Sequence, residues 1–448
     1  MPYVIARALG KMAGMATRPL GRPSPLRPAH LIACQRRLTY SSQKAQRMLG
    51  WRPETGKEEA LAATMHSYAA RELVSRRADL RLLGRPPKGE PPLTACLVGC
   101  GVIAQEHLKV LSRMPNAKVL ALCDLNRGAA QELAQRFNVP RTYDDVAAML
   151  DAEQPGVVHI LTPPQTHARF AELAARKGCN VLVEKPMAVD AAEARRMADC
   201  AAEHGVQLCV DHNHLYDSVV VRARRLVDSG AVGDVIWIES YYGFNLGDNP
   251  ASRYMLPGGD GHWTFQLPGG LYQNLAPHPL CLALELLGPP RRVHAHARYG
   301  RVLPHAPTDE LRVLLESEKA SGLVTVSLAA SPRFQYLNIF GTKMVVFVDL
   351  LNKWLIAEHV MRGVPKPVSR AVMNVRRGWT VLRRTCSGML QVLRKRWTPY
   401  EGMDLLIREF YGSLQARRTP PVGAEEGIQV MEVMDEVWRQ IGRESLAW

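Results

Sequence analysis

Between residues 93 and 211, short apolar runs alternate with segments whose apolar residues recur at helical spacing. The apolar runs are LTACLVG, KVLALCD, VVHILT, NVLVE and VQLCVD, and the segments between them include AAQELAQRF and ARFAELAARKG. Strands that alternate with helices along a chain form a parallel sheet with helices on both faces. The pattern therefore predicts a doubly wound α/β domain over residues 93–215.

The pattern changes after residue 215, where strand-like runs are separated by turns rather than by helices. These runs are DVIWIESYYG, RRVHAHARYG, ELRVLLES, GLVTVSLAA, YLNIFG and MVVFVDLL. They predict an α+β domain over residues 216–448 with a large, mostly antiparallel open sheet. Helices are expected at about 218–229, 270–287, 400–416 and 424–441, with a basic helical insertion at about 369–397. The composition of GRPPKGEPP makes residues 76–92 a linker.

The formal net charge of +15 is concentrated in two flanks of the chain. Arginine dominates the residues before 91, and residues 361–400 contain many basic residues and no acidic one. No nucleic-acid reading motif accompanies this charge, so no nucleic-acid partner is expected. The nine cysteines form no CxxC pair, which favours a reducing compartment. We expect a cytoplasmic protein, since no apolar run reaches the roughly 18 residues of a membrane span.

The run CLVGCGVIAQEH contains a glycine turn between a predicted strand and a predicted helix. Its G-x-G-x-x-A spacing is that of a Rossmann dinucleotide site, in which the helix N-terminus receives a pyrophosphate. An acid at the end of the next strand, about 20 residues on, suits a ribose hydroxyl and favours NAD. Arg127 close by keeps NADP open. The predicted cofactor contacts here are Gly99, Gly101, Val102, Ile103, Ala104, Asp124 and Leu125.

Two further motifs follow predicted parallel strands at their carboxyl ends, where ligands of open α/β sheets bind. In TPPQTH, Thr162, Pro163 and His167 are predicted cofactor contacts, although a rigid loop with a histidine cap is an alternative. In VEKPM, Glu184 and Lys185 end a buried strand. A lysine there can stabilise the alkoxide that develops during hydride transfer. The alternative for Lys185 is a surface ion pair with Glu184.

These motifs and their order resemble those of the Gfo/Idh/MocA family of NAD(P)-dependent oxidoreductases over about residues 91–448. Further shared runs are GTKMVVFVDL and PPVGAEEGIQVMEVMDEVW. The resemblance implies that Lys185 is catalytic, as is the lysine of the family's EKP motif. It also implies that His278, in PGGLYQNLAPHP, is a catalytic base. Asn274 stands where the family usually has aspartate, and a carboxamide can orient a hydroxyl group but cannot take its proton.

Several further residues are candidates for substrate binding. They are Asn213 and His214 in DHNHLYDS, where many members of the family have arginine in place of the histidine, and Arg253, Tyr254 and Trp263 in a long loop. His212 and His214 also form an H-x-H pair, but the sequence offers no third and fourth metal ligand nearby. No metal is therefore expected.

Residues 1–75 resemble the C-terminal end of an extended short-chain dehydrogenase/reductase of the nucleotide-sugar epimerase type. The resemblance rests on KAQRMLGWRP and the helical pattern after it. The glycine turn and the Tyr-x-x-x-Lys pair of such enzymes are absent, so no separate activity is expected from this segment.

The sequence is consistent with two main functions and, as a third possibility, with a related reductase that acts on a non-sugar carbonyl or imine. The first is an NAD(P)-dependent oxidoreductase that moves a hydride between nicotinamide and a ring carbon of a sugar or nucleotide sugar, in polysaccharide biosynthesis. The second is a degraded dinucleotide-binding accessory protein of a membrane-associated glycan assembly complex. The basic segment 369–397 is either a solvated helix over the sheet or a peripheral membrane contact. A homo-oligomer is expected through the open sheet.

Overall fold

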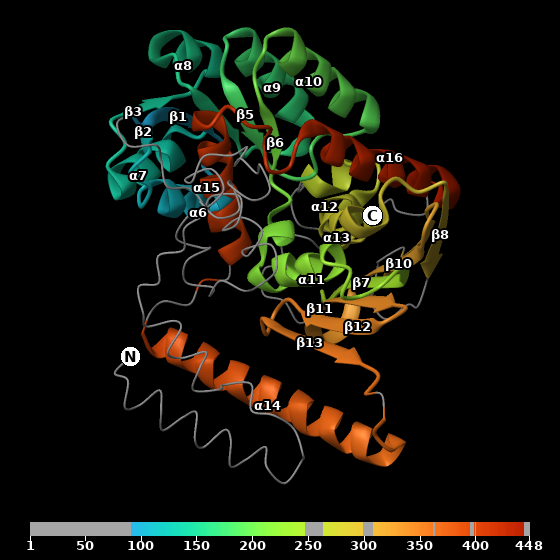
Figure 1. Ribbon diagram of the computed structural model, residues 1–448. Coiled ribbons are helices and arrows are strands. Elements are labelled where there is room, and N and C mark those ends of the chain that lie inside the picture. The colour runs from blue at the N-terminus through green and yellow to red at the C-terminus, as the bar shows by residue number, and fades with distance from the viewer. Residues whose placement is uncertain are drawn as a thin grey trace, which may run out of the picture. The chain divides into compact units, whose positions relative to one another are not determined.

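The structure is a computed structural model that describes residues 91–246, 263–298, 308–361, 363–394, 398 and 400–442 (Figure 1). The predicted epimerase-like segment 1–75 lies outside these residues, as does all of the predicted linker 76–92 except its last two residues. Arg253 and Tyr254 also lie outside the described residues.

The first domain is built on the predicted parallel sheet. Its strands are β1 (Leu93–Val98), β2 (Ala117–Cys123), β3 (Arg141–Tyr143), β4 (Val157–Ile160), β5 (Asn180–Val183) and β6 (Leu208–Val210). They lie in the order β3-β2-β1-β4-β5-β6 and every neighbouring pair is parallel. The sequence pattern did not reveal β3, because this edge strand is short and has no apolar run. The confirmed architecture is a doubly wound Rossmann sheet.

Five helices cover this sheet. They are α6 (Val102–Leu111), α7 (Arg127–Phe137), α8 (Val146–Glu153), α9 (His167–Arg176) and α10 (Ala191–Glu203). Polar caps start three of them: the side chains of Asn126, Asp145 and Asp190 accept hydrogen bonds from first-turn amides of α7, α8 and α10. In Figure 1, α8, α9 and α10 lie above the sheet and α6 and α7 lie below it. These five helices cover the two faces of the sheet and leave the carboxyl ends of its strands uncovered.

The second domain has a seven-stranded mixed sheet. Its strands are β7 (Val235–Asn245), β8 (Arg292–Arg298), β9 (Glu310–Glu316), β10 (Ser321–Ser327), β11 (Ala329–Gly341), β12 (Met344–Asp349) and β13 (Trp354–His359). Their order is β13-β12-β11-β7-β10-β9-β8, and among the described strands of this second sheet only β7 and β10 pair in parallel. The prediction of a mostly antiparallel sheet is confirmed. The edge strand β13 extends it beyond the predicted runs.

The helices of this part are α11 (Ser218–Asp228), α12 (Gly270–Leu275), α13 (Pro277–Leu287), α14 (Lys366–Leu393), α15 (Glu401–Gln415) and α16 (Ala424–Ile441). The single helix expected over 270–287 is two helices that meet at Ala276. Pro277 has no N–H to continue the ladder of α12, and it suits the first turn of α13. Short 3₁₀ segments are η2 (Pro164–Thr166), η3 (Asn213–Tyr216) and η5 (Trp263–Gln266).

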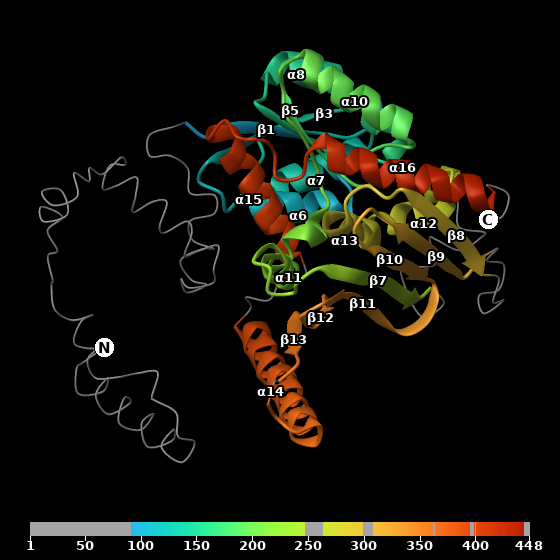
Figure 2. The same ribbon diagram turned by 45° about the vertical axis from the view of Figure 1, so that its right-hand side comes forward.

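The last two helices pack back against the first domain. Helix α16 contacts α10 as well as β8 and α13, and α15 contacts α6 and η3. A side chain at Gly402 of α15 would lie 2.1 Å from the main-chain oxygen of Asn213, so the two segments approach closely. Figures 1 and 2 both show α12 and α13 between the two sheets. Among the helices that the structure describes, none is long and apolar enough to cross a bilayer.

Candidate active site

The glycine turn leaves room for a dinucleotide at the carboxyl edge of the Rossmann sheet. Gly99 has a positive φ of 96°, and a Cβ there would lie 2.7 Å from the main-chain oxygen of Leu161. Gly101 is the N-cap of α6, and the space beside its Cα is open. Val102 and Leu125, on either side of this turn, are highly exposed. Open amides at a helix N-terminus with exposed apolar side chains beside them fit a pyrophosphate and its nucleoside.

Asp124 is held in place at the end of β2. Its Oδ2 accepts a hydrogen bond of 2.7 Å from the Cys100 amide and its Oδ1 accepts one of 2.8 Å from the Asn126 amide. The carboxylate is thereby fixed against the glycine turn, where a ribose hydroxyl would lie. Arg127, the residue that keeps NADP open, forms an ion pair with Asp144.

His167 connects the two motif loops. The ring is buried, with Nε2 2.7 Å from the Thr162 carbonyl oxygen and Nδ1 3.1 Å from the Pro186 carbonyl oxygen. Burial lowers its pKa, so the ring is neutral and donates from one nitrogen at a time. His167 thus holds the loop of Thr162 and Pro163 in position. The sequence predicted that all three residues contact the cofactor.

Lys185 leaves β5 through a cis peptide bond to Pro186 and points toward α12. Its Nζ donates to Asn274 Oδ1 at 2.8 Å and to the Asn274 carbonyl oxygen at 3.1 Å. Burial lowers the pKa of Lys185, while the charges of Glu184 and Asp211 oppose that shift. The lysine is therefore not the exposed partner of Glu184 that the alternative interpretation required.

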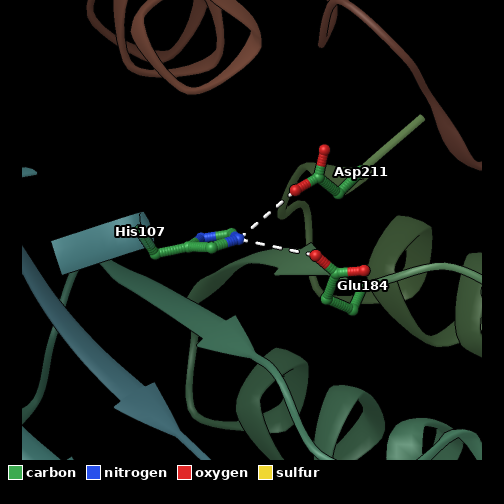
Figure 3. Close-up of side chains that lie close together, drawn as sticks. All are labelled: His107, Glu184 and Asp211. Carbon is green, nitrogen blue, oxygen red and sulfur yellow. Dashed lines mark ion pairs between the residues drawn. The ribbon is translucent and has the colours of Figure 1, made fainter. Parts of the chain in front are cut away.

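Glu184, the residue before Lys185, belongs to a buried ionic cluster with His107 and Asp211 (Figure 3). His107 Nε2 lies 3.3 Å from Asp211 Oδ2 and 3.6 Å from Glu184 Oε1. Burial alone would lower the pKa of His107, but the two carboxylates beside it raise that pKa to about 9. Burial and the neighbouring Glu184 raise the pKa of Asp211 to about 6. The three residue types also occur as metal ligands, yet a protonated His107 already accounts for their close approach.

The cluster continues into the protein interior. His107 Nδ1 lies 2.9 Å from His159 Nδ1, and His159 Nε2 lies 3.0 Å from the Tyr411 hydroxyl oxygen of α15. Burial and the charge of His107 lower the pKa of His159 well below its usual value, so His159 is neutral. Polar side chains therefore continue from Glu184 and Asp211 through His107 and His159 to Tyr411, on the helix that packs back from the second domain.

Three histidines and one arginine lie close to Lys185, namely His212, His214, His278 and Arg333. The His278 ring stacks on Tyr242 with centroids 5.3 Å apart and meets His214 edge-on at 4.9 Å. Burial lowers the pKa of His278 well below its usual value, and the charges of Lys185, His214, His212 and Arg333 add to this effect. Burial and Lys185 also lower the pKa of His212, to about 4. Both rings are thus neutral near pH 7, and His278 is a proton acceptor of low basicity.

The remaining predicted substrate residues lie at different places. Asn213 Oδ1 is buried and has no hydrogen-bond partner among the described residues. His214 Nδ1 lies 2.8 Å from Asp217 Oδ2, which fixes the imidazole beside His278. Trp263 begins η5, and its carbonyl oxygen accepts a hydrogen bond from Gln165 in the TPPQTH turn. Trp263 therefore lies beside the TPPQTH turn.

Five contributors to this site were missed from the sequence: His107, His159, Asp211, Tyr242 and Arg333. His107 and Asp211 carried a usable signal, because one lies on the helix after the glycine turn and the other ends a predicted parallel strand. Tyr242 and Arg333 carried none. They come from β7 and β11, and Arg333 Nη2 reaches the Tyr242 hydroxyl at 3.2 Å only because those strands pair.

Two family models match this chain. The model described as "Oxidoreductase family, NAD-binding Rossmann fold" matches residues 93–212, and the "GFO/IDH/MocA C-terminal domain" matches residues 220–346. Together they span more than half of the 448 residues. The resemblance predicted from the motifs spans about residues 91–448, so it contains both matches and extends beyond them, whereas the predicted epimerase-like segment lies outside both matches.

Similar proteins include a D-apiose dehydrogenase of Paraburkholderia graminis, 35% identical over 32% of this chain and 38% of its own length. A D-glucoside 3-dehydrogenase of Escherichia coli is 29% identical over 46% of this chain and 58% of its own length. The chain thus spans about half the length of these curated relatives. Among solved structures, the WlbA dehydrogenase of Bordetella pertussis, in complex with NADH and UDP-GlcNAcA, aligns with a TM-score of 0.61 at 21% identity. That alignment covers 78% of this chain and 96% of the other.

The solved structure supports the fold, and the two family matches cover the glycine turn, the TPPQTH and VEKPM motifs and the run with Asn274 and His278. The chain belongs to the Gfo/Idh/MocA family of oxidoreductases, with an NAD-binding Rossmann domain followed by the family's C-terminal domain.

Proposed function

We propose that this protein is an NAD-dependent dehydrogenase or reductase that acts on a secondary alcohol or ketone of a sugar ring. The carrying observation is the hydrogen bond of 2.8 Å between Lys185 Nζ and Asn274 Oδ1. This bond holds the partly buried Lys185 ammonium, which follows β5 at the carboxyl edge of the Rossmann sheet. The glycine turn and Asp124 follow other strands at the same edge. Bound NAD would supply the hydride acceptor there.

Each neighbouring side chain has a separate task in this proposal. The Lys185 ammonium stabilises negative charge on the substrate oxygen as the C–H bond breaks. Asn274 holds that ammonium in place and orients the hydroxyl group. A ring nitrogen of neutral His278 receives the hydroxyl proton during oxidation and returns it during reduction. The ionic cluster has two carboxylates and one imidazolium, so its net charge is negative. The charges of Glu184 and Asp211 favour the protonated form of Lys185.

A nucleotide-linked sugar is the substrate class that we favour. The guanidinium of Arg333 lies 5.7 Å from the Tyr242 ring centroid and suits a diphosphate. The WlbA dehydrogenase of similar fold carries UDP-GlcNAcA. Cytoplasmic polysaccharide biosynthesis remains the predicted setting.

Asn274 also favours a second candidate, an accessory protein that binds a dinucleotide but has lost turnover. The carboxamide accepts the hydrogen bond from Lys185, so it preserves the geometry, but it cannot take a proton. Cofactor binding would be common to both candidates, and only turnover would separate them.

A fluorescence titration of the full chain with NADH and NADPH tests the cofactor assignment, and a screen of UDP- and dTDP-linked sugars then tests turnover. We expect NADH to bind more tightly than NADPH. Asp124→Ala should weaken NADH binding by about tenfold or more, because charge-assisted hydrogen bonds contribute about 1.5–3 kcal/mol. The matched control is Asp144→Ala, which removes an exposed carboxylate that pairs with Arg127.

Equal loss of affinity in both variants would contradict the assignment of Asp124. Tight NADH binding without turnover on any sugar or nucleotide sugar would favour the accessory protein. Absence of binding by a folded protein would overturn both candidates.

A further inference from the structure

Helix α14 differs from every other long helix that the structure describes, because it contributes nothing to the core. It has 28 residues, about 42 Å of helix, and none of these described residues is buried. Figures 1 and 2 both show it beside β13 at the edge of the second domain. A helix of this length that only packed on the sheet would bury an apolar face against it.

Most of the apolar residues of α14 form one continuous stripe along the helix. At 3.6 residues per turn, the stripe contains Val368, Ala371, Val372, Val375, Trp379, Leu382, Met389, Leu390 and Leu393. Their exposure is high: Val375 is 72% exposed, Trp379 and Met389 are each 65% exposed, and Leu393 is 75% exposed. An unbroken apolar stripe in water marks an interaction surface.

Basic residues occupy the rest of the helix. They are Lys366, Arg370, Arg376, Arg377, Arg383 and Arg384, and the helix has no acidic residue. Arg376 and Arg383 flank the apolar stripe, and the others lie opposite it. Arg377 pairs with Glu358 on β13 and its guanidinium lies 5.5 Å from the Phe347 ring centroid. The basic side of the helix therefore faces the sheet. Of the apolar stripe, Val375 and Trp379 border a groove against β13, and the other stripe residues are not part of that groove's lining.

We propose that α14 docks this protein on an anionic lipid surface, with the helix lying in the plane of the membrane. The stripe would enter the boundary between head groups and acyl chains, and the flanking Arg376 and Arg383 would reach lipid phosphates. Trp379 has the amphipathic ring that is enriched at this depth. The site between the two domains would then work close to the membrane surface.

The charge pattern argues against a second copy of α14 as the occupant of the stripe. Two such helices in contact through their stripes would bring the flanking Arg376 and Arg383 of each helix together, and α14 has no acidic residue to pair them. A lipid surface supplies both the negative charge and the apolar layer in one partner. This argument uses only α14 and β13, so it is independent of the proposed activity.

Sedimentation of the full chain with vesicles tests the proposal. The variant Leu382→Glu/Met389→Glu places two acids in the stripe, at positions that are 55% and 65% exposed. The matched control Val381→Glu/Val392→Glu places two acids on the same helix outside the stripe, at positions that are 40% and 54% exposed. Both variants change the net charge equally. Circular dichroism and NADH titration would verify that both are folded.

We expect the unaltered protein to sediment with phosphatidylcholine–phosphatidylglycerol vesicles and to sediment much less with phosphatidylcholine alone. The stripe variant should bind about tenfold more weakly than the control variant, because only it places charge in the lipid layer. Equal binding by the two variants, or no binding by the unaltered protein, would overturn the proposal. So would a stripe variant that changes from oligomer to monomer without lipid, since a second copy would then cover the stripe.

Discussion

Lys185 and helix α14 represent two opposite uses of positive charge in one chain. Lys185 is a single cation, partly buried, with a buried pair of carboxylates behind it and Asn274 in front of it. The α14 cations are on the surface, and their spacing along one helix already defines their arrangement. A buried charge depends on groups from distant parts of the chain, whereas an amphipathic helix carries its surface in its local sequence.

The largest effect of a substitution is expected at Lys185 itself. We expect Lys185→Met to reduce turnover by about 10³-fold, since loss of a group that stabilises the developing oxyanion costs about that much. NADH affinity should change by less than about threefold, because the fixed carboxylate and the glycine turn remain. The measurement is the initial rate with the most active sugar nucleotide. Lys177→Met, which removes a surface cation paired with Asp151, should keep full turnover. Turnover that survives in Lys185→Met would remove the lysine from the mechanism.

The ionic cluster provides the next largest effect. His107→Gln leaves Glu184 and Asp211 buried without their cation, and we expect it to lower the free energy of unfolding by about 3–5 kcal/mol near pH 6.5. Because the folded-state pKa of His107 is raised to about 9, its contribution is complete below its unfolded pKa of about 6.5 and is lost as the pH rises through 9. The pKa of Asp211, at about 6, lies below this range.

Urea denaturation at several pH values between 6.5 and 9 would measure the gap between the two proteins. We expect the gap to shrink by about 3 kcal/mol over that range. A gap that stays constant would show that His107 is neutral in the cluster.

A smaller change is expected at Asn274. The substitution Asn274→Asp places a carboxylate next to Lys185 Nζ, which should raise the pKa of the lysine by about one unit or more. The alkaline limb of kcat/KM should move to higher pH by the same amount, while the maximal rate stays within about tenfold. Asn274→Ala removes the hydrogen bond without adding charge, so its alkaline limb should not rise. An alkaline limb that moves equally in both variants would show that the charge at position 274 does not control the pKa of Lys185.

The smallest effect should come from α14. We expect the stripe variant Leu382→Glu/Met389→Glu to keep kcat/KM for a water-soluble sugar nucleotide within about twofold, because surface substitutions far from a site change little. Steady-state rates without lipid would measure this. A large drop in kcat/KM would mean that α14 supports the site directly, and the contrast drawn between Lys185 and α14 would then be wrong.

Much of the site could be predicted from strand ends. Gly99, Asp124, Thr162 and Lys185 each follow a predicted parallel strand, and parallel strands bring their carboxyl ends to one edge. The roles of His167 and His278 could not be predicted in the same way. Burial turns His167 into a link between two loops, and burial beside Lys185 makes His278 a far weaker base than a free imidazole.

The sequence by itself determined the alternation of strands and helices in the Rossmann domain apart from β3, the place of the glycine turn, and the amphipathic character of α14. These features depend on periodicity and on residues that are near one another in the chain. Only the tertiary structure decided the charge states of the site and the exposure of the α14 stripe. His107, Glu184, Asp211 and Tyr411 are far apart in sequence, and desolvation and pairing depend on which of them fold together.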